Sequence, residues 1–174
     1  SATAEANRSF QSSLTVSENS STDMRATATD AAGNVSLCSA AIVYVHDNTA
    51  PEPPVLTGSS PATPGTSLSP EILGTTEIGA TARLYEGTDC TGSELASDVA
   101  TDGSFILDAT VERLETKSFY ATSTDPAGNT STCSAGFSYE HLLPDGSPCA
   151  GAGVCHSGYC EDHTCCASGC GLLC

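Results

Sequence analysis

The sequence predicts an all-β protein, built from β-sandwich repeats and ending in a small module held together by disulfides. Three observations lead to this prediction. A stretch of the chain recurs 95 residues later, short segments alternate apolar and polar residues, and seven of the ten cysteines lie between Cys149 and Cys174. Alternation with a period of two is typical of strands that bury one face.

The composition excludes some functions and favours an oxidising compartment. The 174 residues carry a formal net charge of −16, with five Lys and Arg together. A phosphate backbone or an anionic membrane needs a cationic surface, so we expect no nucleic-acid binding and no membrane binding. No apolar run reaches the roughly 18–20 residues of a transmembrane helix, so we expect no membrane insertion. Ten cysteines favour an extracellular or cell-surface location.

The internal repeat defines the domains. Ser9–His46 aligns with Ser104–His141 without a gap, and 17 of these 38 positions are identical. A period of 95 residues is close to the roughly 100 residues of an immunoglobulin-type sandwich. The sequence therefore predicts tandem immunoglobulin-like sandwiches. Residues 1–48 form the C-terminal half of one repeat, residues 49–143 a complete repeat, and residues 144–174 a cysteine-rich module that we expect to be truncated.

The alternation within the complete repeat predicts about seven strands. Four groups of residues should each share one strand face: Ala80, Ala82 and Leu84; Phe105, Leu107, Ala109 and Val111; Phe119, Ala121 and Ser123; and Ala135, Phe137 and Tyr139. We expect Leu84, Phe105, Leu107, Val111, Phe119 and Phe137 in the core. In the half repeat we expect strands around Phe10–Val16, Met24–Thr29 and Ala40–Tyr44. The prolines of Asp47–Pro54 should stiffen the linker between the copies.

A half repeat alone would expose its inner face and unpaired strand edges, which folded proteins avoid. Two explanations follow. The missing strands lie upstream in a longer polypeptide, or a neighbouring subunit donates them as in donor-strand filaments. We prefer the first, because the tail also ends on an odd number of cysteines.

Three stretches of the chain resemble the bacterial Ig-like repeats of large surface adhesins and cell-envelope proteins. They are Asp47–Pro51, Ile72–Tyr85 and Ala121–Ser131, the last of which recurs at Ala26–Ser36. The resemblance covers roughly the first 143 residues. It implies a stalk, spacer or adhesive rod, in contact with neighbouring repeats or with copies of itself.

The tail is too short and too poor in apolar residues to fold around a core, so we expect cross-links to hold it. Its cysteines are Cys149, Cys155, Cys160, Cys165, Cys166, Cys170 and Cys174. Seven is odd, so one thiol must pair elsewhere or stay free, and the spacing leaves the connectivity open. The pattern resembles cysteine-rich modules in secreted proteins of myxobacteria. A zinc site with His156 and His163 is the disfavoured alternative, because no C-x2-C pair is present.

Cys90 and Cys133 are the only cysteines of the complete repeat, so we expect them to pair. Strand counting places them toward opposite ends of the domain, and a loop folding across the sheet would resolve this. Cys38 corresponds to Cys133, and its partner would lie before Ser1.

We expect no enzymatic activity. The sequence contains no recognisable nucleophile motif, phosphate loop or zincin helix. His46 and His141 recur at matching positions, which indicates a structural role, because a catalytic base would not be needed twice.

Acidic residues give one candidate site. In a sandwich of this type, three loops meet at the end where the chain enters, and they carry Glu77, Asp102 and Asp125. The linker adds Asp47, Asn48 and Glu52. Hard oxygen ligands of this kind suit Ca²⁺. The alternative is that Asp102 and Asp125 only stabilise their turns.

Three classes of function follow. We favour an extracellular, non-catalytic structural or adhesive rod element of a bacterial surface protein or filament. The alternatives are a module that binds surface glycan or protein, and an accessory region of a larger secreted enzyme.

If the acidic loops bind calcium, calcium should raise the melting temperature, because a ligand of the native state stabilises it. Thermal unfolding in chelator and in millimolar calcium measures this. Identical curves would contradict the calcium hypothesis.

Overall fold

The computed structural model describes residue 2 and residues 9–167. The chain divides into two units, Ser1–Thr49 and Ala50–Cys174. The described residues are all-β apart from one short 3-10 helix, η1 (Ala152–Val154). None of their helices is long and apolar enough to span a membrane.

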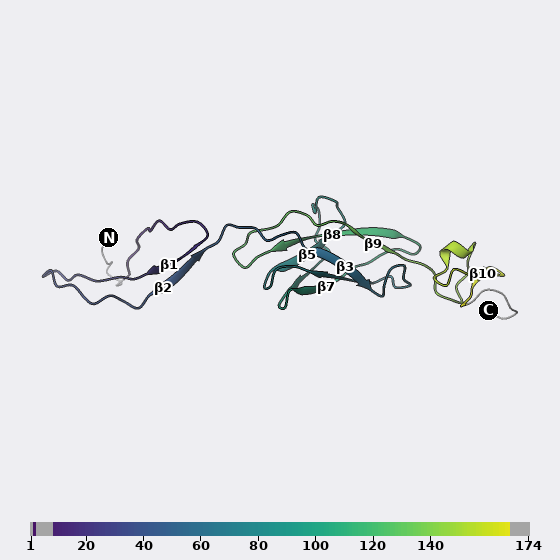
Figure 1. The fold of residues 1–174 in the computed structure, drawn as a ribbon, viewed down its shortest axis with the longest axis horizontal. Coiled ribbons are helices and arrows are strands. Elements are labelled where there is room, and N and C mark those ends of the chain that lie inside the picture. Colours follow the sequence, from purple (N-terminus) through teal and green to yellow (C-terminus); the bar gives the residue numbers. More distant parts are fainter. Residues whose placement is uncertain (1, 3–8, 168–174) are drawn as a thin grey trace. The chain divides into compact units, whose positions relative to one another are not determined.

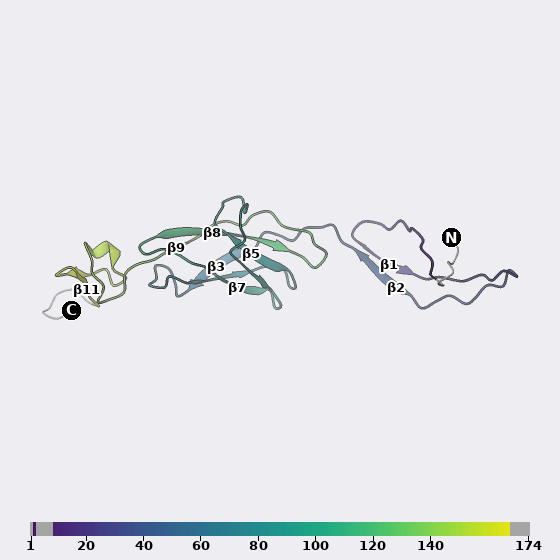
Figure 2. The same cartoon turned by 180° about the vertical axis from the view of Figure 1, so that it is seen from behind.

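The second unit contains an antiparallel sandwich of seven strands. They are β3 (Val55–Ser60), β4 (Glu71–Thr75), β5 (Thr81–Tyr85), β6 (Ala96–Val99), β7 (Ser104–Asp108), β8 (Thr116–Thr124) and β9 (Phe137–Glu140). One sheet has the order β3-β4-β7 and the other β6-β5-β8-β9. The two sheets form the layers seen in Figure 1 and, from behind, in Figure 2. The predicted strand number is confirmed.

Side chains from both sheets meet in one core, which contains Ile72, Ala82, Leu84, Phe105, Leu107, Ala109, Val111, Phe119 and Tyr139. Six of these nine side chains are large (Ile, Leu, Phe or Tyr), and the other three are Ala or Val. The Phe105 ring occupies the space that a side chain at Gly74 would need. Alternation along the strands therefore predicted most of the core.

The last strand departs from the expected pattern. Ala135 is exposed and Phe137 only half-buried, whereas Tyr139 is fully buried. Regular pairing of β9 with β8 begins at Phe137. The residues before it lie beside β8 through serine side chains, so the period of two does not extend back to Ala135.

The first unit contains one antiparallel hairpin, β1 (Ser20–Met24) and β2 (Ile42–His46). The predicted strands over Phe10–Val16 and Met24–Thr29 are wrong, and the third is shifted by two residues. Phe10 corresponds to Phe105 in β7, and β7 pairs with β4. Met24 corresponds to Phe119 in β8, and the part of β8 that follows Phe119 pairs with β5. Among its described residues the first unit has no equivalent of β4 or β5, so neither segment has the neighbouring strand that β7 or β8 pairs with in the second unit, although residues 26–29 still bond to residues 35–39.

The tail forms a second small core around Leu143, Cys149, Cys155 and Cys165. A short antiparallel pair, β10 (Cys160–Glu161) and β11 (Thr164–Cys165), crosses it. The Leu143 amide donates to the Val154 carbonyl at 2.7 Å, and the His156 amide donates to the Leu143 carbonyl at 2.9 Å. Leu143 therefore joins the end of the sandwich to the disulfide module.

The repeat supplies a matched pair of substitutions for testing the core. Phe105 is 2% exposed and Phe10, at the equivalent position, is 61% exposed. Phe105→Ala should lower the free energy of unfolding of the sandwich by about 3–5 kcal/mol, because it leaves a cavity. Phe10→Ala should change it by less than about 0.5 kcal/mol, as surface substitutions do. Chemical denaturation of both variants measures this, and equal losses would contradict the core assignment.

Candidate functional site

The segment that follows β3 lies side by side with, and parallel to, the last segment of the sandwich. Gly65 and His141 form a parallel bridge. The Gly65 amide donates to the Glu140 carbonyl at 2.9 Å, and the Leu142 amide donates to the Gly65 carbonyl at 2.8 Å. We call residues 63–67 and 139–142 the terminal-strand clip. Because its two segments are parallel, the chain enters the sandwich at one end and leaves at the other.

Tyr139 anchors the terminal-strand clip from inside the core. Its hydroxyl donates to the Ser67 carbonyl at 3.2 Å and accepts from the Ser67 amide at 3.3 Å. The Glu140 amide donates to Thr63 Oγ1 at 2.9 Å. A side chain at Gly65 would collide with the Tyr139 hydroxyl. Burial raises the pKa of Tyr139 above its ordinary value.

The two repeated histidines bind backbone at equivalent positions. His141 Nδ1 accepts from the Leu114 amide at 3.2 Å, and His46 Nδ1 accepts from the Asn19 amide at 3.3 Å. His141 is buried. Each imidazole thus stabilises the loop that precedes its own hairpin.

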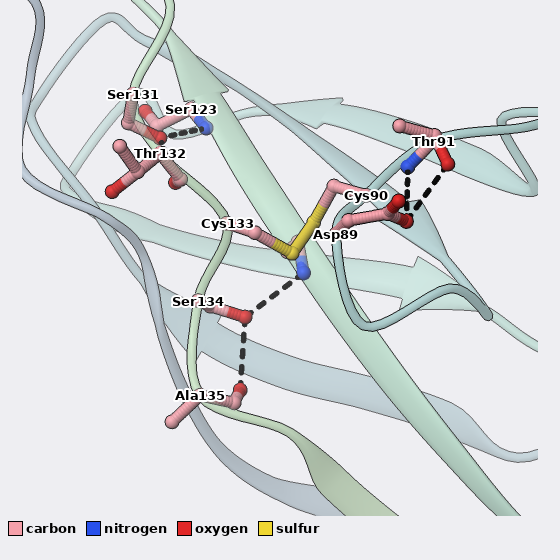
Figure 3. The surroundings of a disulfide bond; sticks show 10 residues. Asp89, Cys90, Thr91, Ser123, Ser131, Thr132, Cys133, Ser134 and Ala135 are labelled. Carbon is pink, nitrogen blue, oxygen red and sulfur yellow. Dashed lines mark hydrogen bonds between the residues drawn. A yellow bond between two sulfur atoms is a disulfide. The ribbon is translucent and has the colours of Figure 1, made fainter.

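A disulfide and two serines fasten the segment that precedes β9. Cys90, in the β5–β6 loop, is bonded to Cys133, with the Cα atoms 5.5 Å apart. The Ser123 amide donates to Ser131 Oγ and the Ala121 amide to Ser134 Oγ, both at 2.9 Å (Figure 3). These serines place Cys133 beside β8, not at the far end of β9. The apparent separation of the two cysteines in the sequence is thereby resolved.

The three acidic loops meet at one end of the sandwich. The Thr76 amide donates to the Gly103 carbonyl at 2.9 Å, and Thr76 Oγ1 donates to Ser123 Oγ at 2.6 Å. Asp102 accepts from the amide and hydroxyl of Ser104, and the Ser104 hydroxyl is the main cause that lowers the pKa of Asp102. Within the described ranges, no three carboxylates come within 4.8 Å of one another.

Asp125 closes the β8–β9 turn. Its Oδ1 accepts from the Asn129 amide at 2.9 Å, and its Oδ2 accepts from Asn129 Nδ2 at 2.8 Å. The hydrogen bond from the Asn129 side chain is the largest cause that lowers the pKa of Asp125. Gly128 follows with φ of 97°, a conformation that glycine adopts without strain. These contacts are the turn chemistry that the sequence offered as an alternative to calcium.

Of the three linker candidates, Asp47 and Asn48 belong to the first unit, and Glu52 is an exposed residue of the second. Asp47 Oδ1 accepts from the Thr49 amide at 3.0 Å, and the Asn48 amide donates to Asn19 Oδ1 at 2.8 Å. Local hydrogen bonds thus engage both residues. Calcium binding by this set, with Glu77, stays a prediction.

The tail cysteines form disulfides, as the sequence predicts. Cys149 is bonded to Cys160 and Cys155 to Cys165, and Cys166 is disulfide-bonded as well. The sulfur atoms of Cys149, Cys155 and Cys165 lie within 4.8 Å of one another. Disulfide sulfurs are not the thiolates that zinc requires, so the oxidised module is not a zinc site. Cys170 and Cys174 lie outside the described residues.

Comparison with protein-family models and with curated proteins finds no match for this chain. The resemblance to surface-adhesin repeats and to myxobacterial modules therefore stays an expectation.

The sequence contained signals for the terminal-strand clip and the serine contacts that the prediction did not use. Tyr44 and Tyr139 are identical at equivalent positions, and so are the serine pairs at 36 and 39 and at 131 and 134. Thr63, Gly65 and Ser67 had no such signal, because no equivalent of that segment is present in the first copy.

The lowered pKa of Asp125 predicts how stability depends on pH. The carboxylate stabilises the fold above its ordinary pKa near 3.8, and this contribution disappears as pH falls through the lowered folded value. Asp125→Asn should therefore destabilise the sandwich at pH 7, and its deficit relative to wild type should shrink below about pH 3.8.

Denaturant titrations across this pH range measure the difference. Asp30→Asn is the control, because Asp30 makes the same contacts to Asn34 in the first unit and should leave the sandwich unaffected. A deficit that is constant with pH would contradict the role of the Asp125 charge.

Proposed function

We propose that this chain is a mechanical spacer of an extracellular protein, a non-catalytic rod element of a bacterial surface protein or filament. The terminal-strand clip is the observation that supports this most. Its two segments are parallel and directly hydrogen-bonded, so tension between the chain ends pulls them along each other. The bonds between Gly65, Glu140 and Leu142 then carry load together, not one after another.

Two further observations favour this function over catalysis. The residues that could do chemistry have structural partners: His141 binds the Leu114 amide, and Asp125 binds Asn129. The Cys90–Cys133 disulfide also encloses much of the sandwich, with a sequence separation of 43 residues. Under tension, that loop would stay closed after the rest of the domain had opened.

Single-molecule force spectroscopy of the full chain, held by its two ends, tests the proposal. Reduction should lengthen the unfolding step of the sandwich by about 140–155 Å, because it frees 43 residues of roughly 3.3–3.6 Å each. Cys90→Ser with Cys133→Ser should give the long step without reductant. Tyr139→Phe should lower the rupture force, because it removes both hydrogen bonds to Ser67.

The direction of pulling is the decisive control. Handles at Thr101 and Ala127, two exposed residues in loops at the same end of the sandwich, should open it at a lower force than handles at the chain ends. A rupture force through the ends that is equal or lower would refute a role as a spacer under tension.

A further inference from the structure

The first unit reproduces the β8–β9 hairpin of the second, shifted by 95 residues. The pairs Ser21↔Val45 and Met24↔Ile42 in β1–β2 correspond to Thr116↔Glu140 and Phe119↔Phe137 in β8–β9. The register is therefore identical in the two hairpins. Both are built to the same plan at the level of the backbone.

The side-chain contacts are also identical. The Ala28 amide donates to Ser36 Oγ at 2.9 Å and the Ala26 amide to Ser39 Oγ at 3.1 Å. Asn34 binds both oxygens of Asp30, its amide at 2.8 Å and its Nδ2 at 2.8 Å. Each of these bonds has its counterpart in the second unit. The β1–β2 hairpin therefore has the same conformation as the β8–β9 hairpin of the complete repeat.

Burial distinguishes the two copies. Tyr44 is 45% exposed where Tyr139 is fully buried, and Leu14 is 63% exposed where Ala109 is 4% exposed. An open pocket of about 550 Å³ lies beside Phe10 and is also lined by Ala2, Ser12 and residues 25–29. The side chains that form a core in the second unit face open space in the first.

The second unit identifies what covers such a face. There, β3 to β6 supply Ile72, Ala82 and Leu84 to the core and carry Cys90, the partner of Cys133. Cys38, at the position of Cys133, is exposed and is the one free thiol among the described residues. The covering segment should therefore resemble residues 50–103 and bring a cysteine at the position of Cys90.

We propose that the apolar face around Phe10, Leu14 and Tyr44 is a docking surface for such a segment, located in the same polypeptide ahead of this chain, and that its cysteine forms a disulfide with Cys38. A second copy of this chain fits less well. Its residues 50–103 are already packed in its own sandwich, and its Cys90 is already bonded to Cys133. The inference concerns what completes this fold, and it stands whether or not the protein acts as a spacer.

An extended chain tests the proposal. A second copy of residues 50–103 replaces residues 1–8, so that its Gly103 precedes Ser9 as Gly103 precedes Ser104 in the native repeat. Alkylation with iodoacetamide, followed by mass spectrometry, should find Cys38 reactive in the original chain. In the extended chain Cys38 should be protected and linked to the inserted Cys90, and a new cooperative unfolding transition should appear.

Two variants separate docking from the disulfide. Cys90→Ser in the inserted segment should restore a reactive Cys38 and keep the new transition, at a lower temperature. Phe10→Ala should lower the new transition in the extended chain and have no effect on the original one.

A reactive Cys38 together with no new transition in the extended chain would overturn the proposal. So would an original chain that sediments as a dimer or polymer with Cys38 protected, because a second copy would then occupy the surface.

Discussion

A β-hairpin with one apolar face needs a second sheet to cover it, and the organisation of this chain depends on that requirement. In the second unit, the sheet that contains β8 and β9 packs against the sheet that contains β4 and β7, and side chains from both form one core. In the first unit, a hairpin of identical register leaves Phe10 and Tyr44 exposed. The same local structure is therefore complete in one copy and unsatisfied in the other.

Directed contacts add to this core in holding the sandwich together. Ser131 and Ser134 hold the chain beside β8 through both their amides and their hydroxyls, and the Cys90–Cys133 disulfide secures the same segment. Tyr139 adds a large buried ring and hydrogen bonds Ser67 at its hydroxyl. Each contact connects segments that are distant in sequence, so their loss should loosen the domain as a whole.

The tail contains few apolar residues that could form a core. Its small core consists of Leu143 and three half-cystines, and two disulfides tie together segments of about ten residues. Cross-links of this kind persist in oxidising environments, which agrees with the cysteine content of the chain. A hydrophobic core thus stabilises the sandwich, whereas disulfides stabilise the module that follows it.

The sequence by itself determined the all-β class, the 95-residue repeat, most of the core and the Cys90–Cys133 pair, because alternation and repetition are local or periodic properties. The tertiary structure decided what depends on partners. Residues 10–16 form no strand because no strand equivalent to β4 pairs with them among the described residues, and Ala135 is exposed because regular pairing of β9 with β8 begins only at Phe137. It also decided which contacts the acidic residues make. Asp125 accepts hydrogen bonds from Asn129, and only the folded loop shows which atoms meet; calcium binding stays a prediction.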